Sequence, residues 1–593
     1  MTPLTADLHR ARSGEPVRGG TLRVAAPGPV TRLDPACAYD LASAQLLRAV
    51  TRQLFTYPST VDLSDPDRVF GLVADVAEEL PTRRNGGISA DRRTWTVRLR
   101  GGVRWDTVPR RPVVAGDFVR ALKRLANPVT GAGAIRYFTS TVEGMERYCA
   151  AYRAAFRGRR PSARDLAAFQ DVHEIAGVTA LDDATLRIRL VEPADDLPHL
   201  LALSCASAVP REYDRYLPGS VELFEHLRSA GPYRMALYRD GGRLLRLERN
   251  PAWDPGTDQV RGQFVDAIEV SATGEPAEAV IGRLARGEAD LAWSMDGVSW
   301  SGPPAERECA PATAAGYTLN PYLVFNLRSP NGGGLTARAA VRRAVALAVD
   351  KRALARILAA TGVPCVVQHG AIPPGCVGHR PFNPYPTPDD RGDPGLARAE
   401  LAAAGLGGGR VTLVAAVRDT PPQRALLASI AADLRRAGID LAVVPCPAQE
   451  YYDRLLGDPA QARAGAWDVA LAGWVPDWFG DNGRAVLQPL FEPNEAPGTT
   501  NYGGYHNPRV DRLVAAALRA GDRDRAAELW HRADREVTRD VAIVPLLASA
   551  MVSPRLHSPR LRNVRFLPHC GFFDVTSLWL DDATDPWEVT AFA

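Results

Sequence analysis

The sequence has almost no lysine. Only two of its 71 basic residues are lysines, and arginine supplies the rest. Alanine, glycine and proline are abundant as well, which fits a high-GC coding bias, so we give the arginine content no functional weight. The 68 acidic residues leave a formal charge of +3, which we expect to be spread over the surface without a dense basic stripe. This balance argues against a nucleic-acid partner.

Long apolar runs are also missing. No stretch offers 18 uninterrupted apolar residues, so we expect no membrane-spanning helix. Residues 1–18 form a polar leader that has neither the apolar core of a secretory signal peptide nor a cysteine for lipidation. Three explanations stay open: the start has been trimmed or misassigned, export uses another route, or the protein works inside the cell.

Motifs of catalysis and metal binding are absent too. The sequence has no G-x-S-x-G, no G-x-x-x-x-G-K-[ST], no H-E-x-x-H and no G-x-G-x-x-G after the first predicted strand. Its eight cysteines are scattered, without a CxxC pair or zinc-like spacing. We therefore predict no structural metal and no cofactor. Cys365 and Cys376 bracket a loop rich in proline and glycine and could pair in an exported protein, or remain two free buried thiols.

What is present is a long chain with the composition of a soluble globular protein. Its 593 residues and 64.0 kDa suffice for two or three well-buried domains, and 46% of them are hydrophobic against 23% charged. Short alternating or β-branched runs predict strands at 21–26, 95–99, 103–105, 185–190, 244–247, 265–270, 322–326, 411–416, 440–444, 468–472 and 543–547.

Helical periodicity alternates with these strands. It predicts helices at 41–54, 118–125, 277–289, 339–359, 395–404, 423–437, 510–520 and 523–538. A tight Arg-Gly-Gly turn at 100–102 should join the strands at 95–99 and 103–105 as a hairpin. In the second half, the alternation of strand and helix predicts parallel strands with helices on both faces, which makes the fold class α/β.

A series of motifs then resembles one known family. GGTLRVA with LDPA, RLRGGVRWD, the GDFVRALKRLANP helix, AGPYRM with LERNPAW, YLVFNLRSP, AVRRAVALAVDK, YHNPRVDRLV and AIVPLLAS follow one another from residue 19 to residue 548. Each motif is weak, but this order resembles the dipeptide/oligopeptide-binding proteins of ABC importers, the extracellular solute-binding protein family 5.

The resemblance implies a two-lobed periplasmic-binding-protein-like clamp of type II, in the large peptide-binding subclass, with a hinge of crossover strands. After the leader, lobe I is expected at 19–270, with an inserted subdomain at about 50–180. Lobe II is expected at 271–555, and 556–593 should return to lobe I. The chain crossings would lie near 265–272 and 552–566. Such lobes close about a ligand, which stabilises the closed state.

The segment after the predicted strand 468–472 offers the best candidate for ligand binding. In the family, a Gly-Trp-x-x-Asp stretch at this place supplies an aspartate for the α-ammonium of the ligand, and Asp477 matches it. Trp474 and Trp478 would form aromatic walls. In the alternative, the two tryptophans fill the core and Asp477 caps a loop. Asp481 and Arg484 depart from the family pattern and could reshape the site for a different ligand.

Other candidates come from the places where the family lines its cleft. Tyr39 and Asp40 follow the LDPA turn, while Asn320, Tyr322 and Asn326 flank a strand of the opposite lobe. Surface-turn and strand-edge roles are equally open for each of them.

Two functions from different classes follow. The first is a receptor, expected to be monomeric and extracytoplasmic, in the periplasm or at the cell surface. It would capture a peptide or peptide-like molecule and deliver it to the permease and ATPase subunits of an ABC transporter, and it would meet the membrane only through that transporter. The second is an intracellular descendant of the fold, working as a biosynthetic enzyme or a small-molecule sensor.

Overall fold

A computed structural model describes residues 16–26, 28–59, 70–131, 133–272, 279, 283–284, 286–292, 316–361, 363–478, 483–495, 498–550, 555–558, 560–567, 572–581 and 590–592. The chain divides into two compact units, which we describe separately. Unit 1 comprises Met1–Gly297 and Ser553–Ala593, and unit 2 comprises Val298–Val552.

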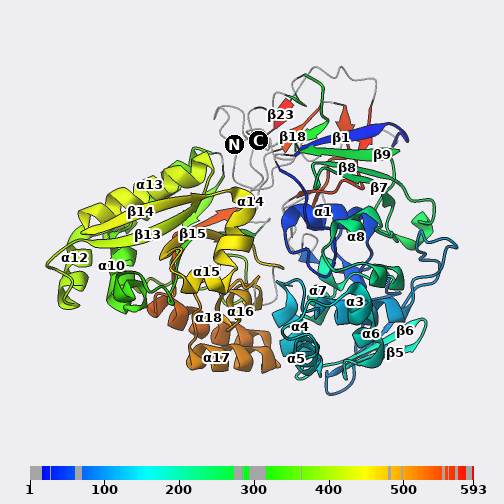
Figure 1. The fold of residues 1–593 in the computed structure, drawn as a ribbon, viewed down its shortest axis with the longest axis horizontal. Helices are drawn as coiled ribbons and strands as arrows, with labels where there is room; N and C mark the ends of the chain where they lie inside the picture. The colour runs from blue at the N-terminus through cyan, green and yellow to red at the C-terminus, as the bar shows by residue number, and fades with distance from the viewer. Residues whose placement is uncertain are drawn as a thin grey trace. The chain divides into compact units, whose positions relative to one another are not determined.

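Unit 1 is built on a seven-stranded sheet with the order β23-β18-β10-β1-β9-β8-β7, in which strands from both ends of the chain meet (Figure 1). Its strands are β1 (Thr21–Ala26), β7 (Tyr233–Arg239), β8 (Leu244–Arg249), β9 (Ala267–Ala272), β10 (Leu291–Ala292), β18 (Arg555–His557) and β23 (Thr590–Phe592). The alternation in β1 buries Leu22 and Val24, and β1 runs parallel to β9 and β10. β9 thus lies within this sheet, between β1 and β8, and unit 1 continues beyond it to Gly297.

A second, three-stranded sheet of unit 1 has the order β4-β6-β5. It contains β4 (Thr94–Arg98), β5 (Val178–Asp182) and β6 (Thr185–Arg189). The hairpin expected at 95–105 is wrong, because β4 pairs with β6 and buries Trp95 and Val97 beside Leu186 and Ile188. Residues 103–105 instead bond to 111–113.

Helices complete unit 1, with short strand pairs at its margins. The helices are α1 (Leu41–Val50), α3 (Ala115–Leu125), α4 (Ile135–Thr141), α5 (Met145–Ala155), α6 (Ala163–Val172), α7 (Leu197–Leu200) and α8 (Val221–Glu225). The short strands are β2 (Phe55–Thr56) with β3 (Val73–Ala74), β19 (Leu561–Arg562) with β22 (Trp579–Leu580), and β20 (Phe566–Leu567) with β21 (Phe572–Phe573).

Unit 2 has its own seven-stranded sheet, with the order β12-β17-β11-β15-β13-β14 and β16 paired to β11. Its strands are β11 (Tyr317–Phe325), β12 (Cys365–Val367), β13 (Val411–Arg418), β14 (Ile439–Cys446), β15 (Val469–Trp474), β16 (Ile543–Pro545) and β17 (Leu547–Ala550). The parallel arrangement expected for this half holds for β13 with β14 and β15, whereas β11, β12, β16 and β17 pair antiparallel.

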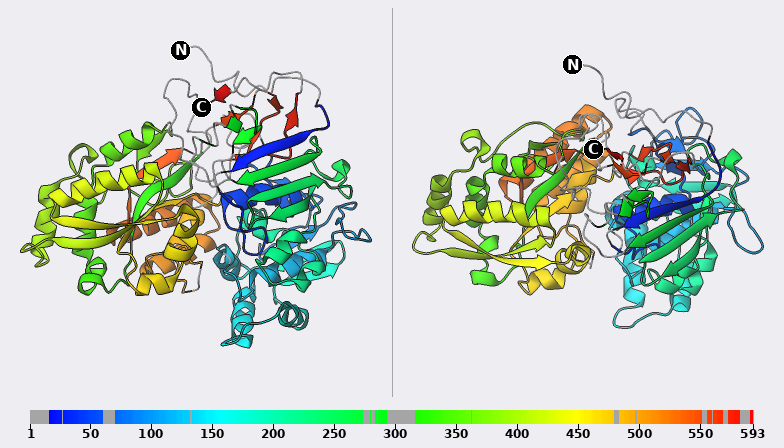
Figure 2. Two further views of the ribbon diagram at one scale, coloured as in Figure 1. Left: turned by 45° about the horizontal axis from the view of Figure 1, so that its top comes forward. Right: turned by 90° about the horizontal axis from the view of Figure 1, so that it is seen from above.

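Helices pack around this sheet, with α13 along β13 and β14 (Figures 1 and 2). They are α10 (Ala339–Ala348), α11 (Lys351–Ala359), α12 (Pro394–Ala403), α13 (Pro421–Arg436), α14 (Ala448–Glu450), α15 (Pro459–Arg463), α16 (Arg484–Phe491), α17 (Pro508–Arg519) and α18 (Arg523–Arg539). The single helix expected at 339–359 is wrong, because Val349 and Asp350 are extended and the Asp350 side chain caps α11 by accepting from Ala353 N at 2.7 Å. The helix expected at 277–289 falls mainly outside the described residues.

Candidate functional site

Polar and aromatic side chains of unit 2 gather where β13 and β15 end and β11 begins. β15 runs parallel to β13 and antiparallel to β11, so its last residue, Trp474, pairs with Leu319 near the start of β11. In open α/β sheets, ligands bind beyond the carboxyl ends of the strands. We call this region, together with the loop 475–478, the carboxyl edge of the unit 2 sheet.

Asn320 lies directly against the end of β15. A Cβ atom at Gly473 would sit 2.7 Å from Oδ1 of Asn320, so the close approach requires glycine at position 473. The backbone of Asn320 is held in turn, because its carbonyl accepts a hydrogen bond from the Ser549 hydroxyl. The predicted site residue Asn320 is therefore partly exposed and fixed at the carboxyl edge.

Arg418, Tyr452 and Tyr502 also belong to this edge, although they are not among the residues predicted from the sequence. Gly473 N donates to the Tyr452 hydroxyl at 3.0 Å. The Arg418 guanidinium, at the end of β13, lies 5.5 Å from the centre of the Tyr452 ring, and the centre of the Tyr502 ring lies 5.9 Å from that of Tyr452. The signals were an arginine two residues after the strand predicted at 411–416 and a Tyr-Tyr pair at 451–452. Neither signal indicates that Arg418 and Tyr452 lie close together in the fold.

The two predicted aromatic walls, Trp474 and Trp478, are core residues. Trp478 has no exposed surface, and Trp474 is 7% exposed. The indole of Trp474 donates to the Ala485 carbonyl at 2.8 Å, which ties β15 to the first turn of α16. These positions favour the core-filling alternative for both indoles, which makes them rigid supports of the loop between them.

Asp477 lies in that loop, partly exposed between the buried Trp474 and Trp478. Its neighbours therefore limit its freedom, because both indoles are packed and one is hydrogen-bonded. A carboxylate held in this way at a sheet edge can accept charge-assisted hydrogen bonds from a cation. Asp481 lies outside the described residues.

Arg484 begins α16 and is fully buried. Its Nε donates to Oε1 of Gln488 at 2.6 Å, one turn further along the helix. With no exposed surface, Arg484 supports α16 in this conformation and does not present its charge at the surface.

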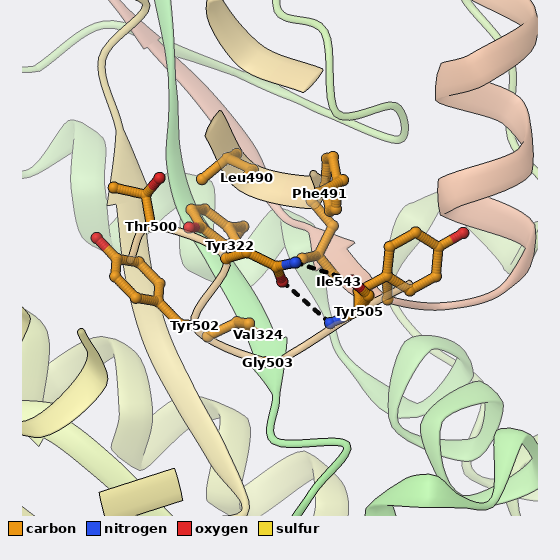
Figure 3. Close-up of a pocket in the computed structure, with 11 residues that line it drawn as sticks. Tyr322, Val324, Leu490, Phe491, Thr500, Tyr502, Gly503, Tyr505 and Ile543 are labelled. Atoms are coloured by element: carbon orange, nitrogen blue, oxygen red, sulfur yellow. Dashed lines mark hydrogen bonds between the residues drawn. The ribbon is translucent and has the colours of Figure 1, made fainter. Parts of the chain in front are cut away.

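Tyr322 points into a small cavity among Leu490, Phe491, Tyr502 and Tyr505 (Figure 3). The cavity volume accessible to water is about 10 Å³, the size of one water molecule. Tyr322 is 1% exposed, and burial raises the pKa of its phenol well above the usual range. This cavity is too small for a peptide or a sugar.

Asn326 is fully buried and its amide serves the fold. Its Nδ2 donates to the carbonyls of Ala462 and Trp467, both at 2.8 Å, and its Oδ1 accepts from Arg328 N at 3.1 Å. These bonds connect the end of β11 to the segment that precedes β15, so Asn326 holds the strands together.

Tyr39 and Asp40 lie in unit 1, at the start of α1. The Asp40 carboxylate caps that helix by accepting from the backbone N of Ser43 at 2.8 Å and from its hydroxyl at 2.7 Å. The Tyr39 ring packs so closely over Gly133 that a Cβ there would lie 2.1 Å from it. Asp40 remains exposed and Tyr39 partly so.

The fold agrees with the comparison to known families. The family "Bacterial extracellular solute-binding proteins, family 5 Middle" matches residues 71–496, well over half of the chain. The chain belongs to this family. The family resemblance and the two-lobed α/β fold class expected from the sequence are thereby confirmed.

Relatives of the family cover most of the chain. It is 24% identical over 467 residues to the periplasmic oligopeptide-binding protein OppA of Salmonella typhimurium, covering 77% of this chain and 76% of that protein. Among solved structures, the clavulanic acid biosynthesis oligopeptide binding protein 2 is 27% identical, with a TM-score of 0.73 and coverage of 95% of this chain and 96% of that one. The periplasmic binding protein DppA of Helicobacter pylori, in complex with the peptide STSA, is 18% identical, with a TM-score of 0.69 and coverage of 95% and 99%.

Three further findings concern metal sites, membrane-spanning helices and disulfides. Among the described residues, no three His, Cys, Asp or Glu side chains gather into a set of metal ligands. No helix in the described part of the chain is long and apolar enough to cross a membrane. Cys365 and Cys376 are free thiols, and burial raises their pKa values to about 11 and about 12.

Proposed function

We propose that the chain is the receptor of an ABC importer and captures a peptide or peptide-like small molecule outside the cytoplasm. It would deliver this solute to permease and ATPase subunits, and would bind it without turnover. Membership of the solute-binding family and the oligopeptide-binding relatives support this proposal.

The arrangement of side chains at the carboxyl edge of the unit 2 sheet supports the proposal and suggests which residues bind the solute. Asp477 would pair with the α-ammonium of the solute, while Asn320 would offer amide hydrogen bonds to its backbone. The buried Trp474 and Trp478 would keep the Asp477 loop in place, so that little conformational freedom is lost on binding.

The test compares a tetrapeptide carrying a free amino terminus with its N-acetylated form, using isothermal titration calorimetry on the full chain. We expect the free peptide to bind more tightly by about ten- to a hundredfold, the range of a hydrogen bond to a charged group. Asp477→Asn should remove that difference. The matched control is Asp524→Asn, which changes an exposed carboxylate on α18 and should leave the difference intact.

Equal affinity for the two peptides would contradict the role of Asp477 while leaving the peptide class intact. Failure of any member of a random peptide library to raise the melting temperature would contradict the peptide class itself, because any ligand that binds the folded state stabilises it.

A further inference from the structure

The outer surface of α5 and the loop into α6 carries an unusual density of positive charge. We call residues 145–165 the α5–α6 tip. Its six arginines are all exposed, and its acidic side chains are Glu146 and Asp165. The arginines are Arg147, Arg153, Arg157, Arg159, Arg160 and Arg164. The even spread of charge expected from the sequence is therefore wrong for this segment. Figure 1 shows α5 and α6 at the end of unit 1 away from β1, β8 and β9 of its large sheet.

The cations of the neighbouring helix α3 are neutralised, in contrast to those of the tip. Arg120 lies 3.1 Å from Asp214, Lys123 lies 2.9 Å from Glu174, and Arg124 lies 2.9 Å from Asp34; Asp171 also contacts Arg120. Charge on α3 is thus balanced within unit 1.

In the tip, five of the arginines have no carboxylate within salt-bridge distance among the described residues; they are Arg147, Arg153, Arg157, Arg160 and Arg164. Arg159 serves the fold, because it donates from Nε and Nη2 to the Ala155 carbonyl at the end of α5, at 3.3 and 3.1 Å. The Asp165 carboxylate is engaged by the backbone N and hydroxyl of Ser162, at 2.9 and 2.8 Å. The positive charge of the tip therefore faces solvent.

The aromatic side chains of the same segment face inward. Tyr148, Tyr152 and Phe156 are buried, and the Tyr152 ring stacks on Phe169 of α6 at 4.2 Å. The exposed apolar side chains of the tip are all small; they are Ala150, Ala151, Ala154 and Ala155.

The tip exposes arginines and alanines and buries its aromatic rings, and this arrangement favours one class of binding partner over others. A single-stranded nucleic acid would need exposed aromatic rings on which to stack bases, and a protein partner would need large anchors that fill pockets. Small alanines flanked by guanidinium groups instead allow close approach to a broad anionic surface, and guanidinium binds phosphate bidentately. We propose that the α5–α6 tip binds the phosphate headgroups of an anionic phospholipid membrane.

Such binding would use residues other than Asp477 and Asn320, which are proposed to hold the solute. It differs from the expectation that the protein meets a membrane only through a transporter. Because basic residues near an anionic bilayer act electrostatically, the affinity should fall as salt is raised.

The test is co-sedimentation of the full chain with vesicles of phosphatidylcholine alone, or of phosphatidylcholine mixed with phosphatidylglycerol. We expect binding only to the mixed vesicles, and a loss of more than about tenfold in the variant R153Q/R157Q/R160Q/R164Q. The control is R512Q/R525Q/R532Q/R535Q, which removes the same charge from exposed arginines of α17 and α18 and should change binding by less than about twofold.

Three results would overturn the proposal: no binding to the mixed vesicles, equal loss in both variants, or equal binding to neutral vesicles. Binding to a duplex DNA that is lost in the tip variant, without vesicle binding, would assign the tip to nucleic acid instead. Circular dichroism should give both variants the same melting temperature. Peptide binding by the tip variant should remain, so failure here and failure of the proposed function are distinguishable.

Discussion

The two units bury charged side chains in different ways. Unit 1 buries them in opposite pairs, and its clearest case is a cluster of two arginines and two aspartates without any exposed side-chain surface. Arg261 lies 2.9 Å from Asp75 and 3.2 Å from Asp258, and Arg52 lies 3.4 Å from Asp258 and also contacts Asp75. Although burial opposes the shift, the two arginines lower the pKa of Asp258.

Unit 2 surrounds two of its buried titratable side chains, Asp534 and Lys351, with neutral groups. Asp534 accepts from the backbone N of Ala371 at 2.6 Å and of Ile372 at 3.2 Å, and burial raises its pKa to about 7. Lys351 donates to the Gln368 carbonyl at 2.9 Å, and burial lowers its pKa to about 7. Neither residue has an opposite charge within salt-bridge distance among the described residues.

The difference shows that a charged side chain can be buried in two ways, and that these two ways make the stability of the fold depend differently on pH. A paired cluster remains charged over a wide pH range, because each charge stabilises its partner. A buried charge held only by neutral groups is stable mainly in its uncharged form, so it makes the stability of the fold depend on pH. We therefore expect unit 1 to be sensitive to loss of a partner and unit 2 to be sensitive to pH.

The largest effect should come from breaking the paired cluster. Arg261→Met leaves Asp75 and Asp258 short of a buried partner and should lower the free energy of unfolding of unit 1 by about 3–5 kcal/mol. Urea denaturation measures the loss, and hydrogen exchange assigns it to unit 1. The control is Arg246→Met, which removes the partly exposed contacts to Glu248 and Glu269 and should change stability by less than about 1 kcal/mol. Equal effects would mean that the buried pairing is unimportant.

A smaller effect should follow at Asp534, whose folded pKa of about 7 exceeds the unfolded value of about 3.9. Its contribution to stability is therefore complete below about pH 4 and is lost progressively as the pH rises through about 7. Asp534→Asn keeps an oxygen that can accept from Ala371 and Ile372 but cannot ionise. At pH 8 we expect the variant to be more stable than the wild type by on the order of 2 kcal/mol.

The measurement is urea denaturation at pH 5 and pH 8, with Asp524→Asn as the matched control on the same helix. The advantage of Asp534→Asn should shrink at the lower pH. A variant that is equally destabilised at both pH values would show that the carboxylate form itself is needed.

Substitution of the two lysines, Lys351 of unit 2 and Lys123 of unit 1, should have smaller effects on the free energy of unfolding, and the two can be compared directly. Lys351 has a folded pKa of about 7 against about 10.4 when unfolded, so its contribution is complete above about pH 10 and is lost as the pH falls through about 7. We expect Lys351→Met to remove this dependence and to raise stability at pH 7 by about 1 kcal/mol. Thermal unfolding at pH 7 and pH 10 measures it.

Lys123 of unit 1 provides the comparison, because it lies 2.9 Å from Glu174. Lys123→Met should lower stability by about 0.5–1 kcal/mol, since Glu174 is 66% exposed and can return to water. The same pH response in both lysine variants would remove the distinction between the two units.

Local patterns predicted many elements closely. The strand expected at 21–26 is β1, and the strands expected at 185–190 and 411–416 are β6 and β13 within two residues. Alternation and β-branching act within a few residues, so they are readable from the chain. The break between α10 and α11 is different, because apolar residues continue on both sides of Asp350 and the helical pattern hides the cap.

The candidate site was predictable only in part. The Gly-Trp-x-x-Asp segment pointed to Asp477, whose role stays a prediction, and to Trp474 and Trp478. The burial of both indoles depends on α16 and the rest of the sheet, which the segment itself does not specify. Arg418 and Tyr452 were missed because more than 30 residues separate them, and only the pairing of strands and the turn after β14 bring them together.

The sequence by itself determined the family, the α/β class and the positions of the longer strands, such as β1, β6 and β13, because ordered motifs and short-range periodicity do not depend on distant contacts. Tertiary structure decided which strands pair, which charges are buried with partners and which without, and how six arginines with no carboxylate between Arg147 and Arg164 face solvent together. Lysine, the rarest basic residue, illustrates the division. The sequence shows that there are two. Both donate to a backbone carbonyl, but only Lys123 has a carboxylate, Glu174, within salt-bridge distance among the described residues, and this difference decides what each does to stability.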